Sequence, residues 1–434
     1  MSDQPSQTID DSPRSDGAST DRAGTGTGEA ARGSRAGQDR QGGLMALLSL
    51  ANTSMFALYL GVGSVLLPTQ IAHLDPAHKV AVLGLVGGVS ALFATVLNPV
   101  AGALSDRTGR RGPWIVGGAL ASLAAMAFLG SVDTVLMAGI GWCLGQATMS
   151  VYQAATTAVV PDRIPAERRG TASALVGLGL PVGGTVGVLV ASATAGAPRT
   201  GYLVLGAIVA VAGLLLTTLG REPRRAPKPS VPLRRQFATF LQALANHDFR
   251  WAFIGRALLV LGYFSVMGYQ LYILSDHVRL PAGLTPAAAI AVLTPVSMAA
   301  MIVSTLVGGV LSDRWNRRKL FVGASATLSG LVMVVPVVSP TWTGMLVFSA
   351  LNGLAFGCFV AVDTALVTLV LPSSEDTARD MGVLNIAGAG PQIVAPFVAS
   401  QVIAHLGGYN GLFVVGGVLS VLGGLAIAPI RTVR

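Results

Sequence analysis

Twelve long apolar stretches, separated by short polar segments, constrain this chain more than any other feature of its sequence. An apolar run of about 18 or more residues is long enough to cross the hydrocarbon core of a bilayer as a helix. Inside lipid every backbone N–H and C=O group needs an internal partner, which helices supply. Only 11% of the residues are charged, against about 25% in soluble domains. The sequence therefore predicts an all-α polytopic membrane protein with twelve transmembrane helices.

The predicted helices form two bundles of six. They cover residues 44–67, 79–104, 114–131, 134–160, 171–194, 201–219, 250–275, 286–311, 320–338, 342–371, 381–406 and 409–430. The stretch 1–43 is rich in Ser, Gly, Asp and Arg and poor in large apolar residues, so we expect a disordered cytoplasmic tail. The domain boundaries expected from this pattern are 44–219 for the N-terminal bundle, 220–249 for a basic cytoplasmic linker and 250–434 for the C-terminal bundle.

A charged hairpin occurs twice, 207 positions apart. The first copy is Gly102-Ala-Leu-Ser-Asp106-Arg, and the second is Gly309-Val-Leu-Ser-Asp313-Arg. Each copy follows one apolar run and leads into the next. Mid-span prolines, Pro181 and Pro391, recur at a similar offset. The repeat indicates two similar halves in parallel order, an arrangement typical of transporters with a central binding site.

The positions of the basic residues predict the orientation. With the N-terminus inside, 25 of the 29 Lys and Arg residues fall in the inner segments and three in the outer loops. Short cytoplasmic loops carry this excess, so we expect both termini in the cytoplasm of a multi-pass protein of the plasma membrane. The net charge of +9 then reflects topology and contact with anionic lipid, and we expect no nucleic-acid partner.

The first hairpin resembles the loop signature of the major facilitator superfamily (MFS), and the resemblance covers about residues 44–430. Gly102, Asp106, Arg107, Gly109, Arg110 and Arg111 match that signature. The second copy keeps Asp313, Arg314, Arg317 and Arg318, while Asn316 replaces the glycine. The resemblance implies that these residues form a conformational latch, in which Asp106 and Asp313 bind the N-terminal ends of helices in the opposite bundle. Such an end carries partial positive charge.

Parts of the chain are similar to one MFS branch, the glycoside and sucrose–proton symporters. The similar segments are Asp106–Trp114, Val362–Pro372, Ala378–Asn385 and Pro391-Gln392. Gly112 stands where that branch usually has a third Arg. Drug antiporters often carry an Arg within the fourth helix, and residues 139–146 contain none.

Two charged residues fall within predicted spans. Asp363 is the acid and Arg256 is the base, and both lie in the half of the C-terminal bundle nearer the cytoplasm. A charge inside a membrane span is costly, so we expect the two to form an ion pair or to share a polar network. Asp363 would then either bind the coupled proton or serve as a structural partner of Arg256, and the sequence leaves both roles open.

Polar side chains on otherwise apolar spans are candidate substrate ligands. The set is Asn52, Tyr59, Tyr152, Gln153, Tyr263, Tyr269, Gln270, Asn385 and Gln392. Amides and phenols in an apolar cleft suit a neutral ligand with many hydroxyl groups. The alternative for each amide is a hydrogen bond between helices.

These patterns favour a secondary active transporter that works by alternating access. The leading hypothesis is a proton-coupled symporter of a sugar or glycoside, acting as a monomer on a small-molecule substrate in the lipid bilayer. An MFS efflux antiporter for a drug-like or hydrophobic compound is the alternative. No nucleophile–base set, nucleotide-binding motif or metal-ligand spacing occurs in the sequence, so we expect no enzyme activity, no cofactor and no metal.

Overall fold

The computed structural model describes residues 26–165, 168–220, 246–370 and 377–431. The chain divides into two compact units, Met1–Leu44 and Met45–Arg434. In the first unit the described part is helical from Gly26 onward. Composition alone predicts disorder up to residue 43, but Glu, Ala, Arg and Gln between residues 29 and 41 are good helix formers. Residues 1–25 lie outside the described residues.

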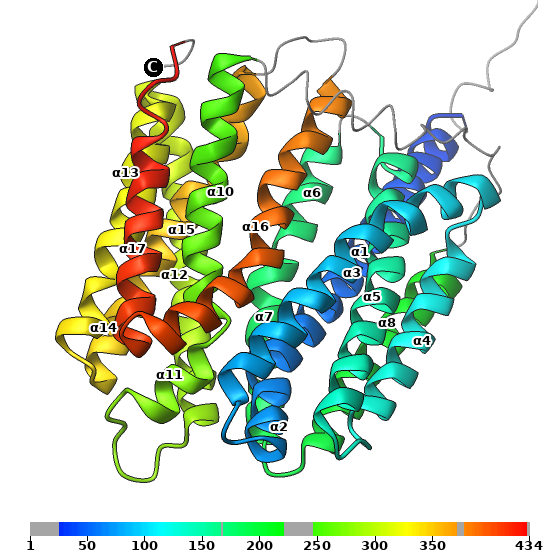
Figure 1. Cartoon of the computed structure of the whole chain (residues 1–434). Coiled ribbons are helices and arrows are strands. Elements are labelled where there is room, and N and C mark those ends of the chain that lie inside the picture. Colours follow the sequence, from blue (N-terminus) through cyan, green and yellow to red (C-terminus); the bar gives the residue numbers. More distant parts are fainter. Residues whose placement is uncertain (1–25, 166–167, 221–245, 371–376, 432–434) are drawn as a thin grey trace, which may run out of the picture. The chain divides into compact units, whose positions relative to one another are not determined.

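The described part of the chain is nearly all helical (Figure 1). The elements are α1 (Gly26–Gly61), η1 (Val62–Leu66), α2 (Leu67–Leu74), α3 (Lys79–Thr108), α4 (Gly112–Leu129), α5 (Val135–Arg163), α6 (Arg169–Gly177), α7 (Gly179–Ala193), α8 (Pro198–Leu219), α10 (His247–Met267), α11 (Gln270–Asp276), α12 (Pro286–Trp315), α13 (Arg318–Val332), α14 (Val334–Val338), α15 (Trp342–Val370), α16 (Thr377–His405) and α17 (Gly408–Leu425).

Twelve helical segments of the described chain are long and apolar enough to cross a membrane. This number confirms the fold class expected from the hydropathy pattern. Leucine and valine side chains remain exposed along the outer faces of several spans, as expected for surfaces in contact with lipid. The predicted linker lies largely outside the described residues, and the description resumes at Asn246, whose side chain caps α10 by accepting hydrogen bonds from the amides of Asp248 and Phe249.

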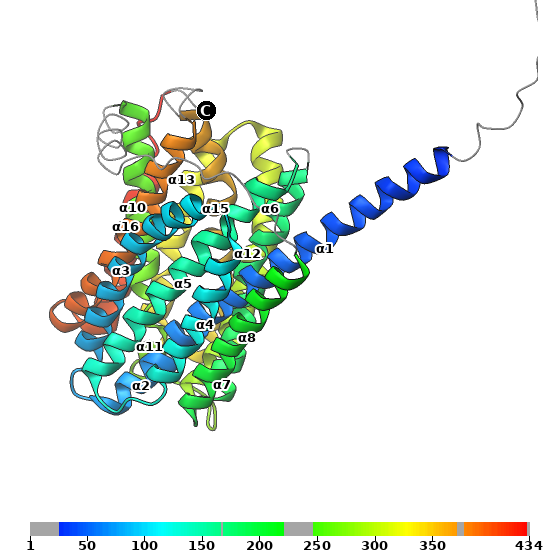
Figure 2. The same cartoon turned by 90° about the vertical axis from the view of Figure 1, so that its right-hand side faces the viewer.

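Figures 1 and 2 show α2 and α11 at the end of the second unit that lies opposite the C-terminus. We call this the Asp276 end, after the last residue of α11. Helix α3 begins beside α2 and finishes at the other end, which we call the Asp106 end. The halves meet where α3 packs on α16 and where α7 packs on α12.

Glycines allow helices to approach closely at the interfaces. A Cβ atom placed on Gly187 of α7 would lie 2.0 Å from the carbonyl oxygen of Ala57 on α1. A Cβ atom on Gly84 of α3 would lie 2.8 Å from the carbonyl oxygen of Pro396 on α16. Small residues permit such backbone contact between helices in a membrane.

Several spans that the sequence predicts as single helices are interrupted. The fifth span breaks at Leu178, between α6 and α7, and the ninth at Met333, between α13 and α14. In both cases a proline follows three residues later, and its missing N–H removes one hydrogen bond of a continuous helix. The seventh span ends at Gly268, and α11 forms a separate short helix.

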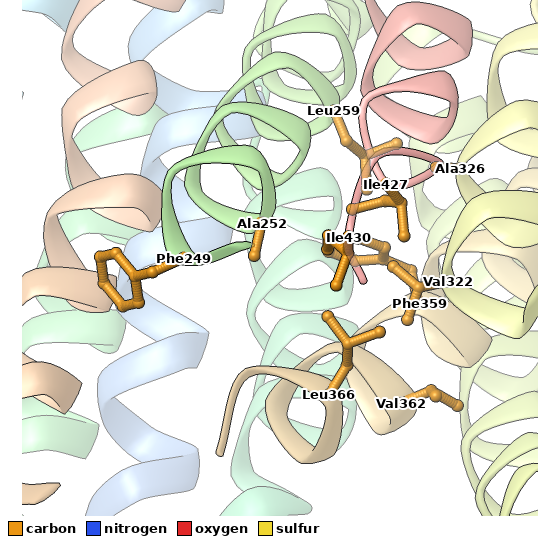
Figure 3. Close-up of a cluster of buried hydrophobic side chains, with 10 residues drawn as sticks. All are labelled: Phe249, Ala252, Leu259, Val322, Ala326, Phe359, Val362, Leu366, Ile427 and Ile430. Atoms are coloured by element: carbon orange, nitrogen blue, oxygen red, sulfur yellow. The ribbon is translucent and has the colours of Figure 1, made fainter. Parts of the chain in front are cut away.

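A buried hydrophobic cluster fixes α10 and α15 near the Asp106 end (Figure 3). Its members are Phe249, Ala252, Leu259, Val322, Ala326, Phe359, Val362, Leu366, Ile427 and Ile430. Residues of α10 and α15 in this cluster flank the two charged residues of the same helices. The cluster therefore holds the backbone positions from which Arg256 and Asp363 extend.

Candidate functional site

The two charged hairpins have the same backbone turn. Gly109 directly follows α3 and has φ 63°, and Asn316 directly follows α12 and has φ 49°. Both residues are in the left-handed region, where glycine is common and asparagine is tolerated. The second hairpin thus keeps the turn although its sequence departs from the glycine of the first.

Each hairpin acid bonds an arginine five residues later in the same hairpin. Arg111 contacts Asp106, and Arg318 Nη2 lies 2.8 Å from Asp313 Oδ1. Arg111 also lies 3.2 Å from Asp162, in the last turn of α5. The side chain of Asp106 is 36% exposed and that of Asp313 is 65% exposed. The first hairpin is therefore held more firmly within its own half.

The remaining hairpin residues lie at the surface or along the adjoining helix. Gly102 lies along α3 near Ala154 of α5. The others, which are Arg107, Arg110, Arg314 and Arg317, are exposed. The helix end proposed to bind Asp106 is the start of α16, whose first side chains lie outside the described residues. The latch stays a prediction.

Arg256 of α10 and Asp363 of α15 form an ion pair between two spans. Arg256 Nη1 lies 3.0 Å from Asp363 Oδ2. The Asp363 side chain is 4% exposed, and that of Arg256 is 24% exposed. Gly388 of α16 lies beside the guanidinium group, where a Cβ atom would be in van der Waals contact with Arg256 Nη2 at 3.5 Å. The structure thus brings together the two charged residues that the sequence singles out.

An aromatic group lies two helical turns from this ion pair. Tyr263 of α10 stacks on Phe356 of α15, with ring centroids 3.9 Å apart and planes inclined by 13°. The Phe264 ring lies beside both rings of this stack, with centroids 5.3 Å from Tyr263 and 6.4 Å from Phe356. The Phe359 ring centroid lies 6.4 Å from that of Phe356. Tyr263 is a predicted ligand candidate, whereas the three phenylalanines are not. Each of them lies within eight residues of Arg256 or Asp363 on the same span, and this proximity to a charged residue is the signal in the sequence that could have identified them.

In the N-terminal half, polar candidates bond to neighbouring helices. The Asn52 amide donates to the Val176 carbonyl of α6 at 2.6 Å, and the Tyr152 hydroxyl lies 3.3 Å from the Ala51 carbonyl. Gln153 accepts a hydrogen bond from Asn98 at 3.3 Å. Tyr59 is half-buried on α1. These contacts correspond to the interhelical bonding left open as the alternative.

In the C-terminal half, Tyr269 bridges the two halves, since its hydroxyl lies 3.0 Å from the Val80 carbonyl and 3.1 Å from that of Pro396. Gln270 is half-buried at the start of α11. The exposed Gln392 donates to the carbonyl of Gly388, within its own helix. The Asn385 side chain lies outside the described residues.

A polar network that the sequence does not predict joins the halves at the Asp276 end. We call it the Asp276 network, and its members are Lys79, Tyr272, Ser275, Asp276 and Tyr409. Lys79 Nζ, at the start of α3, lies 2.7 Å from Asp276 Oδ2, and the Tyr409 hydroxyl donates to the same oxygen at 2.7 Å. The ammonium group of Lys79 also lies 5.0 Å from the centre of the Tyr272 ring, within range of a cation–π interaction.

Further hydrogen bonds cross between the halves at this end. The Tyr272 hydroxyl donates to the Pro68 carbonyl at 2.9 Å, and the Ser192 hydroxyl donates to the Ala287 carbonyl at 2.7 Å. Burial alone would raise the pKa of the Asp276 carboxyl, but hydrogen bonds from Lys79, Ser275 and Tyr409 outweigh burial and lower this pKa. The carboxylate is therefore ionised at neutral pH and available to Lys79.

Among the described residues no group of three or more His, Cys, Asp and Glu side chains could hold a metal ion. Both cysteines, Cys143 and Cys358, are free thiols. The chemically distinctive positions of the described chain are therefore the Arg256–Asp363 ion pair, the adjacent aromatic rings and the Asp276 network.

Solved structures of two membrane transporters share the fold of this chain. A peptide transporter POT in complex with sulfate superposes with a TM-score of 0.73 at 13% identity, covering 89% of this chain and 94% of that one. A bacterial homologue of the human lysosomal transporter Spinster, in an inward-facing and occupied conformation, gives 0.68 at 16% identity, covering 89% and 96%. At these identities the likeness concerns the fold.

The sequence itself matches a known family. The profile of the Major Facilitator Superfamily matches residues 42–294 and 282–434, and the chain belongs to this family. A relative from Aspergillus flavus, the MFS transporter asaE, is 24% identical over 364 residues, which cover 82% of this chain and 78% of the relative. The protein is thus a membrane transporter of the MFS type, and such proteins bind small-molecule substrates within a lipid bilayer.

Proposed function

We propose that this protein is a proton-coupled symporter that carries a sugar or glycoside by alternating access. The observation that carries the proposal is the Arg256–Asp363 ion pair, buried between two membrane spans. A charged pair at such a position is costly and typically marks a substrate or ion pathway. The chain contains no nucleotide-binding motif, so an ion gradient is the proposed source of energy.

The proposed orientation sets the Asp106 end in the cytoplasm, where the Lys and Arg residues concentrate. The Asp276 network then lies at the extracellular end of the plasma-membrane protein. Contacts between the halves at that end support a conformation closed to the outside. The likeness to an inward-facing Spinster homologue agrees with this assignment.

Asp363 is the proposed proton-binding residue. Its carboxylate would exchange between Arg256 and a proton as the transporter changes conformation. Arg256 keeps 24% of its side chain exposed, so separation from Asp363 would leave the guanidinium partly hydrated. An arginine sealed in the core could not lose its partner without a large penalty, which amounts to about 3–5 kcal/mol for a buried pair.

The sugar or glycoside assignment is supported by the resemblance of the first hairpin and of the tenth and eleventh spans to glycoside symporters. The Arg256–Asp363 pair also offers donors and an acceptor of the kind that sugar hydroxyls bind. Asn52, Tyr152 and Tyr269 bond backbone carbonyls in this conformation, so they contribute less to this proposal than the residues of α10 and α15.

Efflux of a hydrophobic compound by proton antiport is the second candidate. The observation that favours it is the aromatic group around Phe356, because four neighbouring rings also suit an apolar ligand. The direction of proton-driven movement separates the two functions.

Transport by purified protein in proteoliposomes tests the proposal. With an inward proton gradient, we expect accumulation of labelled glycosides above the external concentration and its loss when a protonophore collapses the gradient. A panel of hydrophobic dyes provides the comparison. Dye export driven by the same gradient, without glycoside uptake, would contradict symport and support the antiporter.

The hairpin latch is part of the same proposal. Gly102, Asp106, Arg107, Gly109, Arg110 and Arg111, with Asp313, Arg314, Arg317 and Arg318, would stabilise the state closed to the cytoplasm. In the described conformation Asp106 and Asp313 bond arginines of their own hairpins. In the other state we propose that the carboxylates turn to helix N-termini of the opposite half, where a charge gains up to about 2 kcal/mol.

A further inference from the structure

The charged pair and the stacked rings share the same two helices. Arg256 and Tyr263 are seven residues apart on α10, and Phe356 and Asp363 are seven residues apart on α15. Seven residues are nearly two helical turns, so each helix presents its charge and its ring on one face, about 10 Å apart. The two helices are antiparallel, and the ion pair and the ring stack are successive contacts between them.

The ion pair keeps unused hydrogen-bonding capacity. Asp363 Oδ2 binds Arg256, while the buried Asp363 Oδ1 has no hydrogen-bond partner within the described residues. Arginine has five N–H donors, and the Arg256 side chain is 24% exposed. The pair can therefore accept a hydrogen bond from a ligand and donate others to it, as neighbouring sugar hydroxyls require.

The face of α15 that joins the ion pair to the rings borders the hydrophobic cluster, because Phe359 belongs to that cluster and its ring also contacts Phe356. Phe359, Val362 and Leu366 of α15 belong to that cluster. Val360 lies one turn from both Phe356 and Asp363 on their side of the helix, and it is 38% exposed. Phe356 is half-buried. Packing therefore leaves this face of α15 accessible in part.

We infer that these two contacts form one elongated binding site for an aryl glycoside. The sugar hydroxyls bind Arg256 and Asp363, and the aromatic aglycone lies against Phe356 and Tyr263. The inference rests on the proposed function and names the class of substrate: a ligand with a polar sugar at one end and a flat apolar ring at the other. Phe356 determines the preference for the ring.

Binding of matched ligands to the purified full-length protein tests this site. Isothermal titration calorimetry compares the phenyl and methyl β-glycosides of glucose, galactose and xylose. For the sugar that binds, we expect the phenyl glycoside to bind about tenfold more tightly than the methyl glycoside, which corresponds to about 1.4 kcal/mol. Aromatic contacts of this kind supply a gain of that order.

Variants at Phe356 assign the gain to the rings. Phe356→Leu keeps an apolar side chain but removes the aromatic face, so the phenyl preference should fall to about twofold while the dissociation constant of the methyl glycoside stays unchanged. Tyr263→Phe should keep the preference. The matched control is Phe128→Leu on α4, a helix that packs on α5 and α8, and it should leave both dissociation constants unchanged.

The outcomes separate this inference from the function on which it rests. Equal binding of phenyl and methyl glycosides, or a phenyl preference that survives Phe356→Leu, overturns the elongated site while symport stands. If every glycoside fails to bind and phenyl-bearing compounds without a sugar bind, both the sugar assignment and the site are wrong. If Phe356→Leu does not fold, Phe356→Tyr and Phe356→Trp, which keep an aromatic face, must retain the preference.

Discussion

The two ends of the helix bundle hold their charged residues in different ways. At the Asp276 end, Lys79 of the N-terminal half binds Asp276 of the C-terminal half, and tyrosine and serine hydroxyls cross between the same halves. At the Asp106 end, the described pairs Arg111–Asp106, Arg111–Asp162 and Arg318–Asp313 each stay within one half. In alternating access, contacts between halves must form at one end and break at the other. The difference indicates which end is closed in this conformation.

The Arg256–Asp363 pair lies between the two ends, and its disruption should have the largest effect. Asp363→Asn mimics the protonated carboxyl permanently. We expect loss of uphill accumulation with preserved exchange of substrate across the membrane, because exchange needs no release of a proton. Accumulation and counterflow in proteoliposomes measure the two activities.

The structural alternative for this pair gives a different result. An arginine without its partner in a buried site costs about 3–5 kcal/mol, so the single variant would be unstable and the double variant with Arg256→Gln would recover. Recovery of insertion and of uphill transport by the double variant would contradict a coupling role for Asp363.

Asp276→Asn should open the Asp276 end. The side chains of Asp276 and Lys79 are 31% and 22% exposed, so solvent screens their attraction. We therefore expect a loss of about 1 kcal/mol, a roughly fivefold shift from closed to open molecules. Double electron–electron resonance measures this shift as a change in the distance between spin labels at positions 133 and 282. The labels are placed in a variant without Cys143 and Cys358. The matched control is Asp75→Asn, because Asp75 bonds His78 of the same loop; an equal effect of the control would refute the assignment.

The pH dependence of the same distance sharpens the comparison. The lowered pKa of Asp276 means that its contribution to closure is complete above the ordinary carboxyl value of about 4 and is lost as the pH falls through the lowered pKa. The facing groups are Lys79, Tyr272 and Tyr409, with His277 next in sequence. We expect a constant closed fraction between pH 5 and 8, about the range in which a histidine titrates. A transition within that pH range would contradict the assignment of the closed state to the Asp276 carboxylate.

At the Asp106 end the expected effects are smaller. Asp106→Asn should reduce transport about threefold with normal insertion, because removing a partly exposed helix-end charge changes the energy by about 0.3–1 kcal/mol. Access of a labelling reagent to the space between the halves at the Asp106 end should rise. Asp313→Asn should have a weaker effect, since Asp313 is more exposed. Equal transport by wild type and Asp106→Asn, with unchanged access, would show that Asp106 plays no part in the conformational change.

The sequence predicts the spans and the charged residues well because each has a local signal. Hydropathy locates the twelve helices, and a charge inside a span is conspicuous. Breaks in helices are harder to predict, since Pro181 and Pro336 interrupt spans whereas Pro99 and Pro295 lie within continuous helices. A proline inside a span therefore does not by itself predict a break in the helix.

The polar residues show a different limit of the sequence. Asn52 and Tyr152 have the composition expected of ligand-binding residues, but the nearest acceptor is a carbonyl of a helix far away in sequence. The Asp276 network also depends on residues 197 positions apart, Lys79 and Asp276. No periodicity reports such contacts, because they depend on how the halves pack.

The glycine contact between α3 and α16 has a practical consequence for the study of the opposite conformation. Gly84 lies close to Ser400 and to the backbone of Pro396, and one added methyl group would meet both within 3 Å. The neighbouring backbone cannot move aside as a flexible side chain can. A bulkier residue at this single position would act as a wedge, so Gly84→Val offers a way to trap the molecule open at the Asp276 end for crystallisation or for the selection of conformation-specific antibodies.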